Sequence, residues 1–122
     1  MKRQLADIQK LTDILAFIEQ IERYVATKSE HDFYNAGSIE KWGIVKLIEN
    51  IGEAAGKLTD ETKQSSTINW KVITGMRNRL VHEYDAINYK IVYEVATLEM
   101  KSLKAEVEKK LDELKEKFKD EL

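Results

Sequence analysis

Apolar residues recur at steps of three and four along most of the chain, and this spacing gathers them on one face of an α-helix. The first such run covers residues 2–27 and the second covers residues 38–58, where Ser38 is the predicted N-cap. The segment between them, residues 28–37, is mostly polar and is expected to form a loop. The pattern therefore predicts two long amphipathic helices in the first half of the chain.

Two further helices are predicted after a polar connection in which Asp60 is expected to cap a short helical turn. The third helix should begin at Asn69 and end between His82 and Asp85, and the fourth should begin near Asn88. The last three turns of the fourth helix are rich in lysine and glutamate, so we expect them to project beyond the bundle or to pack on a second subunit. Four amphipathic helices joined by short loops predict an all-α fold, an antiparallel four-helix bundle with a long C-terminal helix.

The composition agrees with one helical domain over residues 1–122, since the chain has no proline and only five glycines to interrupt its helices. It has no cysteine and only two histidines, His31 and His82, so neither a metal site nor a cofactor is expected. No apolar stretch is long enough to span a bilayer, which predicts a cytoplasmic protein that does not engage membranes. The net charge of −2 requires any RNA site to be a local patch of basic residues.

The candidate chemistry lies in residues 69–84, where Arg77, His82 and Tyr84 follow the order arginine, four residues, histidine, one residue, tyrosine. RNA can be cleaved without a metal if its own 2′-hydroxyl attacks the adjacent phosphate, a reaction that needs a proton acceptor, a proton donor and a fixed positive charge. Histidine titrates near neutrality and arginine binds two phosphate oxygens at once. On an unbroken helix Arg77 and His82 would point about 140° apart, because each residue turns about 100°. They can share a cleft only if the helix loosens near His82 or if two chains build the cleft together.

This triplet resembles the signature of the HEPN domains, specifically their HepT-like branch. Three further segments are similar to that branch, so the resemblance covers most of the chain from Ser38 onward. They are Ile51-Gly52-Glu53-Ala54-Ala55, Ile68-Asn69-Trp70 and Ile91-Val92-Tyr93-Glu94-Val95.

The resemblance implies a metal-independent endoribonuclease toxin that acts on RNA as a homodimer. In that role Arg77 would hold the scissile phosphate, His82 would move protons, and Asn78 and Glu53 would support them. The resemblance also implies a partner, a nucleotidyltransferase (MNT) antitoxin that uses ATP to modify Tyr84.

Other interpretations of the same residues stay open. The chain could be a non-catalytic HEPN module that binds a nucleotide or RNA, or a structural helical adaptor. Glu53 could belong to a solvated helix face, and Tyr84 could simply close one end of the bundle. Trp42 and Trp70 are expected to be anchors in the core or at an interface.

Overall fold

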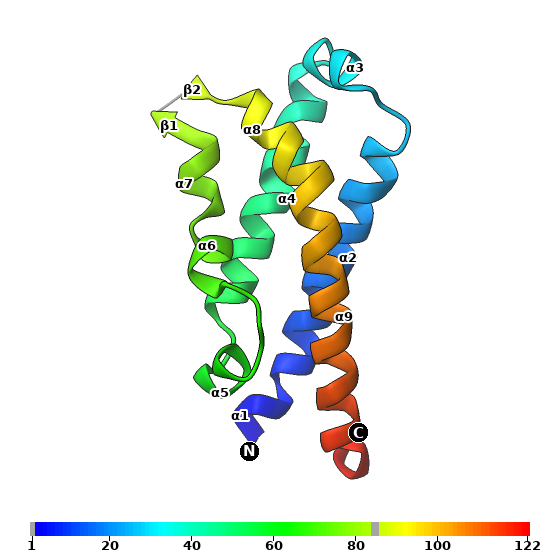
Figure 1. Ribbon diagram of the computed structural model, residues 1–122, viewed down its shortest axis with the longest axis vertical. Coiled ribbons are helices and arrows are strands. Elements are labelled where there is room, and N and C mark those ends of the chain that lie inside the picture. The colour runs from blue at the N-terminus through cyan, green and yellow to red at the C-terminus, as the bar shows by residue number, and fades with distance from the viewer. Residues whose placement is uncertain (1, 84–85) are drawn as a thin grey trace.

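Helices account for nearly all of the regular structure in the computed structural model, which describes residues 2–83 and 86–122 (Figure 1). The α-helices are α1 (Lys2–Leu5), α2 (Asp7–Val25), α3 (Glu30–Tyr34), α4 (Ser38–Gly56), α5 (Asp60–Gln64), α6 (Trp70–Thr74), α7 (Met76–Leu80), α8 (Tyr89–Glu94) and α9 (Met100–Lys117). A π-helical turn, η1 (Val95–Glu99), joins α8 to α9, and a 3₁₀ turn, η2 (Lys119–Glu121), follows α9. The strands β1 (Val81–Glu83) and β2 (Ala86–Ile87) form one short antiparallel hairpin, which leaves the all-α class unchanged.

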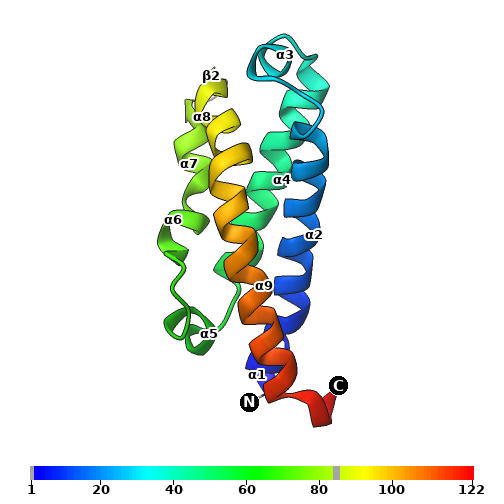
Figure 2. The ribbon, with the colours of Figure 1, turned by 45° about the vertical axis from the view of Figure 1, so that its right-hand side comes forward.

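The long elements run alternately up and down the molecule and form the predicted antiparallel four-helix bundle (Figure 1). Its four rods are α2, α4, the pair α6–α7, and the continuous rod α8–η1–α9. The helix α4 packs against α2 on one side and against α6–α7 on the other, and α9 packs on α2. Figure 2 shows the same rods from another side, with α8–η1–α9 crossing in front of α4.

The core is apolar and runs the length of the bundle, with contributions from every rod. Ile14 and Ile18 of α2, Ile48 of α4, Met76 of α7 and Met100 of α9 are all fully buried. Trp70 is also buried, as predicted, and its indole nitrogen donates to the hydroxyl of Ser66 at 2.7 Å. Trp42 is 46% exposed, so a core position is wrong for this residue and an interface position stays a prediction.

Residues 28–37 do not form the expected loop, because they contain α3. Ser29 and Asp32 cap this helix reciprocally, each side chain accepting from the other's backbone nitrogen. The apolar residue of α3, Phe33, is fully buried and contacts the rings of Tyr24, Tyr89 and Tyr93. Burial of one aromatic ring thus stabilises a helix too short to be visible as a periodic pattern.

The predicted helix starts at Asn69 and Asn88 are confirmed, whereas the predicted caps Ser38 and Asp60 are wrong. Asn69 and Asn88 accept from the backbone nitrogens of residues three positions later and begin α6 and α8, as predicted. Ser38 lies inside the first turn of α4, since Gly37 occupies the N-cap position. Thr59, not Asp60, caps α5, because a contact distant in sequence holds its hydroxyl in place: the carboxylate of Asp7 accepts from it at 2.6 Å.

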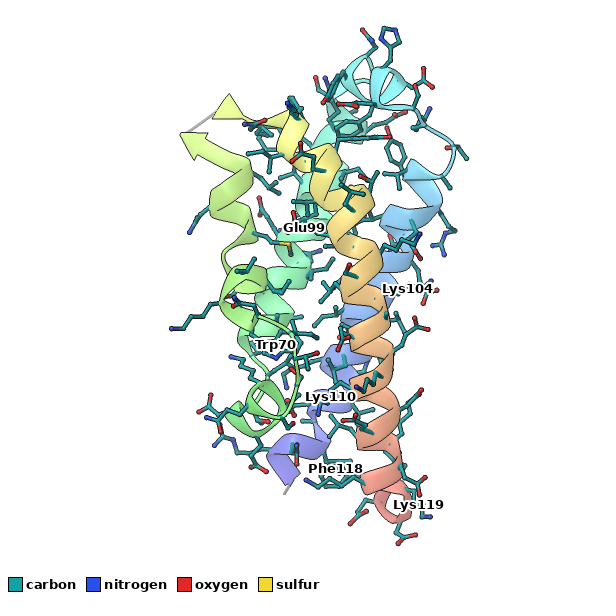
Figure 3. All side chains as sticks on the ribbon, viewed as in Figure 1. Trp70, Glu99, Lys104, Lys110, Phe118 and Lys119 are labelled. Atoms are coloured by element: carbon teal, nitrogen blue, oxygen red, sulfur yellow. The ribbon has the colours of Figure 1, made fainter. Side chains whose placement is uncertain are left out.

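The last turns of the long C-terminal helix do not project from the bundle, so that expectation is wrong. Leu111, Leu114 and Phe118 are buried: α2 packs along α9, and Gln4 of α1 accepts from Lys117 at this end. Polar contacts add to the packing (Figure 3): the ammonium of Lys110 donates to the carbonyl and hydroxyl oxygens of Ser65 at 3.0 and 2.9 Å.

The third predicted helix is shorter than expected and is interrupted. It pauses at Gly75, which separates α6 from α7, and it ends at Leu80 rather than between residues 82 and 85. The carbonyl oxygen of Leu80 accepts from the backbone nitrogen of Asn88 at 2.9 Å, so the hairpin takes over hydrogen bonding where the helix stops. Val81 pairs with Ile87, and His82 consequently lies on a strand.

Candidate active site

Two glycines of α4 set the position of the segment that carries the candidate catalytic residues. A Cβ atom at Gly52 would lie 3.2 Å from the carbonyl oxygen of Ile73, and one at Gly56 would lie 3.7 Å from Thr74 Cγ2. The backbone of α6 therefore rests directly on α4. The next helix, α7, is anchored by Met76 and Leu80, which are fully buried.

Arg77 and His82 belong to different elements, with Arg77 in α7 and His82 in β1. The helix ends between them, which removes the separation of about 140° that a continuous helix would impose. The side chains of both residues lie outside the described part of the structure. Asn78 follows Arg77 in α7; its side chain is exposed and its backbone nitrogen donates to the carbonyl of Gly75 at 3.0 Å.

The other two predicted site residues are Glu53 and Tyr84. Tyr84 lies outside the described residues. Glu53 is exposed on α4 and lines a shallow groove between α2 and α4, together with Lys10, Phe17 and Asn50. Within one chain, α4 contacts α6 at Gly52 and not at Glu53. The structure therefore keeps Arg77 and Asn78 on one short helix and places Glu53 on the α2–α4 side of the molecule.

Two half-buried carboxylates beside α6–α7 were not singled out by the sequence analysis. Glu49 lies three residues before Gly52, on the side of α4 that packs against α6–α7. Glu99 belongs to η1 (labelled in Figure 3) and lines an apolar groove with Ile73 and Leu98. The helical spacing from Gly52 could have identified Glu49, whereas the π-helical turn that places Glu99 leaves no clear sequence pattern.

An aromatic cluster surrounds the start of α8, the helix that follows the hairpin. The ammonium of Lys41 lies 4.6 Å from the ring centre of Tyr89, the first residue of α8, and donates to the carbonyl of Tyr34 at 3.0 Å. Nearby, the phenol of Tyr24 donates to Glu40 at 2.6 Å. Burial and this carboxylate acceptor raise the pKa of Tyr24 to about 12, because both disfavour the phenolate.

The described residues contain neither a candidate metal site nor a candidate membrane-spanning helix. No group of three or more histidine, cysteine, aspartate or glutamate side chains in residues 2–83 and 86–122 could hold a metal ion. In that part of the chain, no helix combines the length and the apolar character that crossing a bilayer requires.

Comparison with known proteins decides the family. The family model described as "Ribonuclease HepT-like" matches residues 14–110, which is most of the chain. This chain belongs to the HepT-like ribonuclease family. The HepT-like match includes the whole of α4, α6, α7 and the positions of Glu53, Arg77, Asn78, His82 and Tyr84.

Relatives over nearly the full length carry names of the same kind. "Putative RNase MJ0125" of Methanocaldococcus jannaschii is 32% identical over 108 residues, covering 88% of this chain and 92% of that protein. "Putative RNase MJ1216" of the same organism is 31% identical over 113 residues, covering 92% and 93%. "Probable ribonuclease HepT" of Thermococcus cleftensis is 28% identical over 110 residues, covering 89% and 97%. No solved structure matches the chain.

Proposed function

We propose that this HepT-like chain is a metal-independent endoribonuclease toxin that acts as a homodimer and is neutralised by a nucleotidyltransferase antitoxin. The observation that carries the proposal is the family match over residues 14–110, which includes the arginine–histidine–tyrosine triplet. The end of α7 at Leu80 supports it, because Arg77 and His82 are no longer held on opposite sides of one helix.

The chemistry follows from the residue types. The 2′-hydroxyl of the RNA attacks the neighbouring phosphate, the bond to the 5′-oxygen of the next nucleotide breaks, and a 2′,3′-cyclic phosphate forms. His82 transfers protons in this reaction. The second chain of the homodimer supplies another His82 imidazole, so that one imidazole accepts a proton while the other donates one. The guanidinium of Arg77 stabilises the charge on the phosphorane, and Asn78 and Glu53 support the groups that hold RNA.

Neutralisation acts on Tyr84, two residues after His82. A nucleotidyltransferase transfers the nucleoside monophosphate of ATP to the phenol oxygen: the new P–O bond forms as the bond between the α- and β-phosphates breaks, and pyrophosphate and the phenol proton leave. The added group brings negative charge and bulk next to His82, and both repel the RNA phosphate.

The test compares cleavage of a single-stranded RNA by the wild type, His82→Ala, Arg77→Ala and Lys101→Ala in the presence of a metal chelator. We expect each site variant to lose about 100-fold or more of the rate, since positioned acid–base groups contribute that much. Lys101→Ala, an exposed change on α9, should keep the wild-type rate. A 2′-deoxy substitution at the cleaved position should abolish cleavage, because the attacking hydroxyl is then missing.

The outcome also separates the nuclease from a binding module. RNA left intact by the wild type would refute the proposal. If in that case His82→Ala still weakened nucleotide or RNA binding, a non-catalytic binding module would replace the nuclease proposal. The net charge of −2 also fits such a module.

A further inference from the structure

The seam between α6 and α9 stays partly open. The rod α4 packs along α2 and along α6–α7, α9 packs along α2, and α7 contacts α8 near the hairpin (Figure 1). Further from the hairpin, a groove of about 420 Å³ lies between α6 and the start of α9. It is open to solvent along its length, unlike the enclosed pockets that bury most of a small ligand. We call it the α6–α9 groove.

The walls of the α6–α9 groove are apolar, and one of them carries a strongly exposed leucine. Ile68 and Ile73 line the groove from the α6 side, and Leu98 and Leu103 line it from the opposite side. Leu98 is 71% exposed although it follows the buried Val95 by three residues, a spacing that keeps side chains on one side of an α-helix. The π-helical turn η1 contains both residues and has a wider turn, so Leu98 points away from the core. This exposed leucine favours an apolar occupant.

The charged residues of the α6–α9 groove are acidic. Glu99 and Glu106 line it, whereas no lysine, arginine or histidine of the described residues does. The two glutamates are seven residues apart, two turns or about 10.5 Å, so they lie on nearly the same side of the rod. The hydroxyl of Thr67 donates to Glu106 at 2.6 Å, and a carboxylate can accept further donors besides. The groove therefore attracts cationic groups and repels the phosphates of RNA.

We propose that the α6–α9 groove binds an amphipathic α-helix of a second protein, one with two lysine or arginine residues two turns apart beside an apolar stripe. This helix lies along the open seam as a further rod. Its apolar side chains contact Leu98, and its two cations pair with Glu99 and Glu106. Helices bound in grooves use anchors three, four and seven residues apart, which matches the two turns between the glutamates. A neutral small molecule would leave both carboxylates without a cation.

A model peptide tests the chemistry of the occupant. The probe is a fluorescent helical peptide with leucines at steps of three and four and two lysines seven residues apart. A second peptide has glutamate in place of both lysines. Fluorescence anisotropy should show that the wild-type chain binds the lysine peptide about tenfold or more tightly than the glutamate peptide, because only the lysines complement the groove.

Two exposed leucines provide a matched pair of variants. Leu98→Ser removes the apolar side chain at the groove and should weaken binding of the lysine peptide by about tenfold or more, since burial of one leucine contributes that much. Leu122→Ser changes a leucine that is nearly as exposed, at 69%, but does not line the groove, and it should keep wild-type affinity. Equal affinities of the two variants would mean that the peptide binds elsewhere and would overturn the proposal.

Charge exchange tests the two carboxylates. The double variant Glu99→Lys/Glu106→Lys should reverse the preference and bind the glutamate peptide more tightly than the lysine peptide. Glu99→Gln/Glu106→Gln keeps the shape of both side chains and should remove the preference. Circular dichroism shows whether each variant folds, and the glutamine pair decides if the lysine pair does not fold. A wild-type preference that persists in a folded double variant would refute the role of the glutamates.

The outcomes are independent of the nuclease proposal, because these measurements contain no RNA and the inference goes beyond the proposed function. A wild type without preference for the lysine peptide would overturn the groove as a helix site, whatever its cleavage activity. If Leu98→Ser, but not Leu122→Ser, prevents self-association in analytical ultracentrifugation, a second copy occupies the groove and the foreign helix is refuted. A chain that leaves RNA intact but passes the peptide tests would keep the groove and lose the nuclease.

Discussion

The buried carboxylate of Asp7 connects the start of α2 to Thr59 and Thr62, at the beginning of α5. Its oxygens accept from the backbone nitrogen of Thr59 at 3.2 and 3.3 Å, from the Thr59 hydroxyl at 2.6 Å and from the Thr62 hydroxyl at 2.5 Å. Asp7 is fully buried, so no water could replace its carboxylate as the acceptor for these donors. Nothing in the local sequence distinguishes Asp7 from the exposed acids around it.

We expect Asp7→Ala to lower the free energy of unfolding by about 3 kcal/mol, because hydrogen bonds to a charged acceptor are lost and buried donors are left unpaired. Urea denaturation measures this. Asp13→Ala provides the matched control on the same helix: Asp13 is exposed and accepts from Gln9 at 2.9 Å, so its loss should cost less than about 0.5 kcal/mol. Equal losses of unfolding free energy in the two variants would show that the buried contacts of Asp7 add no more stability than the exposed contact of Asp13.

At the level of elements, the contact between α4 and α6 decides where α7 lies. The two helices approach closely only because residue 52 has no side chain. The same helix carries Gly43 on its exposed side, where nothing within 4 Å requires a glycine. This pair of glycines separates the effect of packing from that of helix propensity.

Gly43→Ala should raise the free energy of unfolding by up to about 1 kcal/mol, since alanine is the better helix former. Gly52→Ala gains the same propensity but forces the backbone of α6 away, and we expect a net loss of about 1 kcal/mol. Thermal and urea unfolding of both variants, under conditions that keep the protein monomeric, provide the comparison. If Gly52→Ala is as stable as Gly43→Ala, α6 does not depend on this close approach.

Across the whole molecule, the N-terminal and C-terminal segments hold one end of the bundle together. Lys117 donates to the side-chain oxygen of Gln4 at 2.6 Å, and Leu114 and Phe118 are buried at the same end. The charged surface of α9 therefore hides an apolar stripe that continues to its last turn. The long helix is part of the core of its own chain.

Deletion of residues 111–122 should destabilise the fold by at least about 4 kcal/mol, because three large apolar side chains leave the core. Deletion of residues 119–122 removes only exposed positions and should change stability by less than about 0.5 kcal/mol. Unfolding curves of the two truncated chains test this. A long truncation that unfolds like the wild type would mean that the last turns of α9 only pack loosely.

Much of the fold and part of the candidate site could be read from the chain alone. The three- and four-residue spacing of apolar positions predicts the four rods, since a helix must bury one side. The caps at Asn69 and Asn88 were predictable because a cap bonds a nitrogen three residues away. The candidate catalytic residues were chosen from a short motif, and their roles stay proposals.

Contacts between distant segments decided the rest. Phe33 forms α3 by entering an aromatic cluster from two other helices, α2 and α8, and Asp7 makes Thr59 the cap of α5 across a gap of 52 residues. Leu80 ends α7 because the returning backbone at Asn88 takes its carbonyl. The order of residues determined which segments are helical and which face is apolar, since both depend on neighbours a few positions away. Only the packed chain determined where each helix stops and what it covers, because those depend on partners that the sequence keeps far apart.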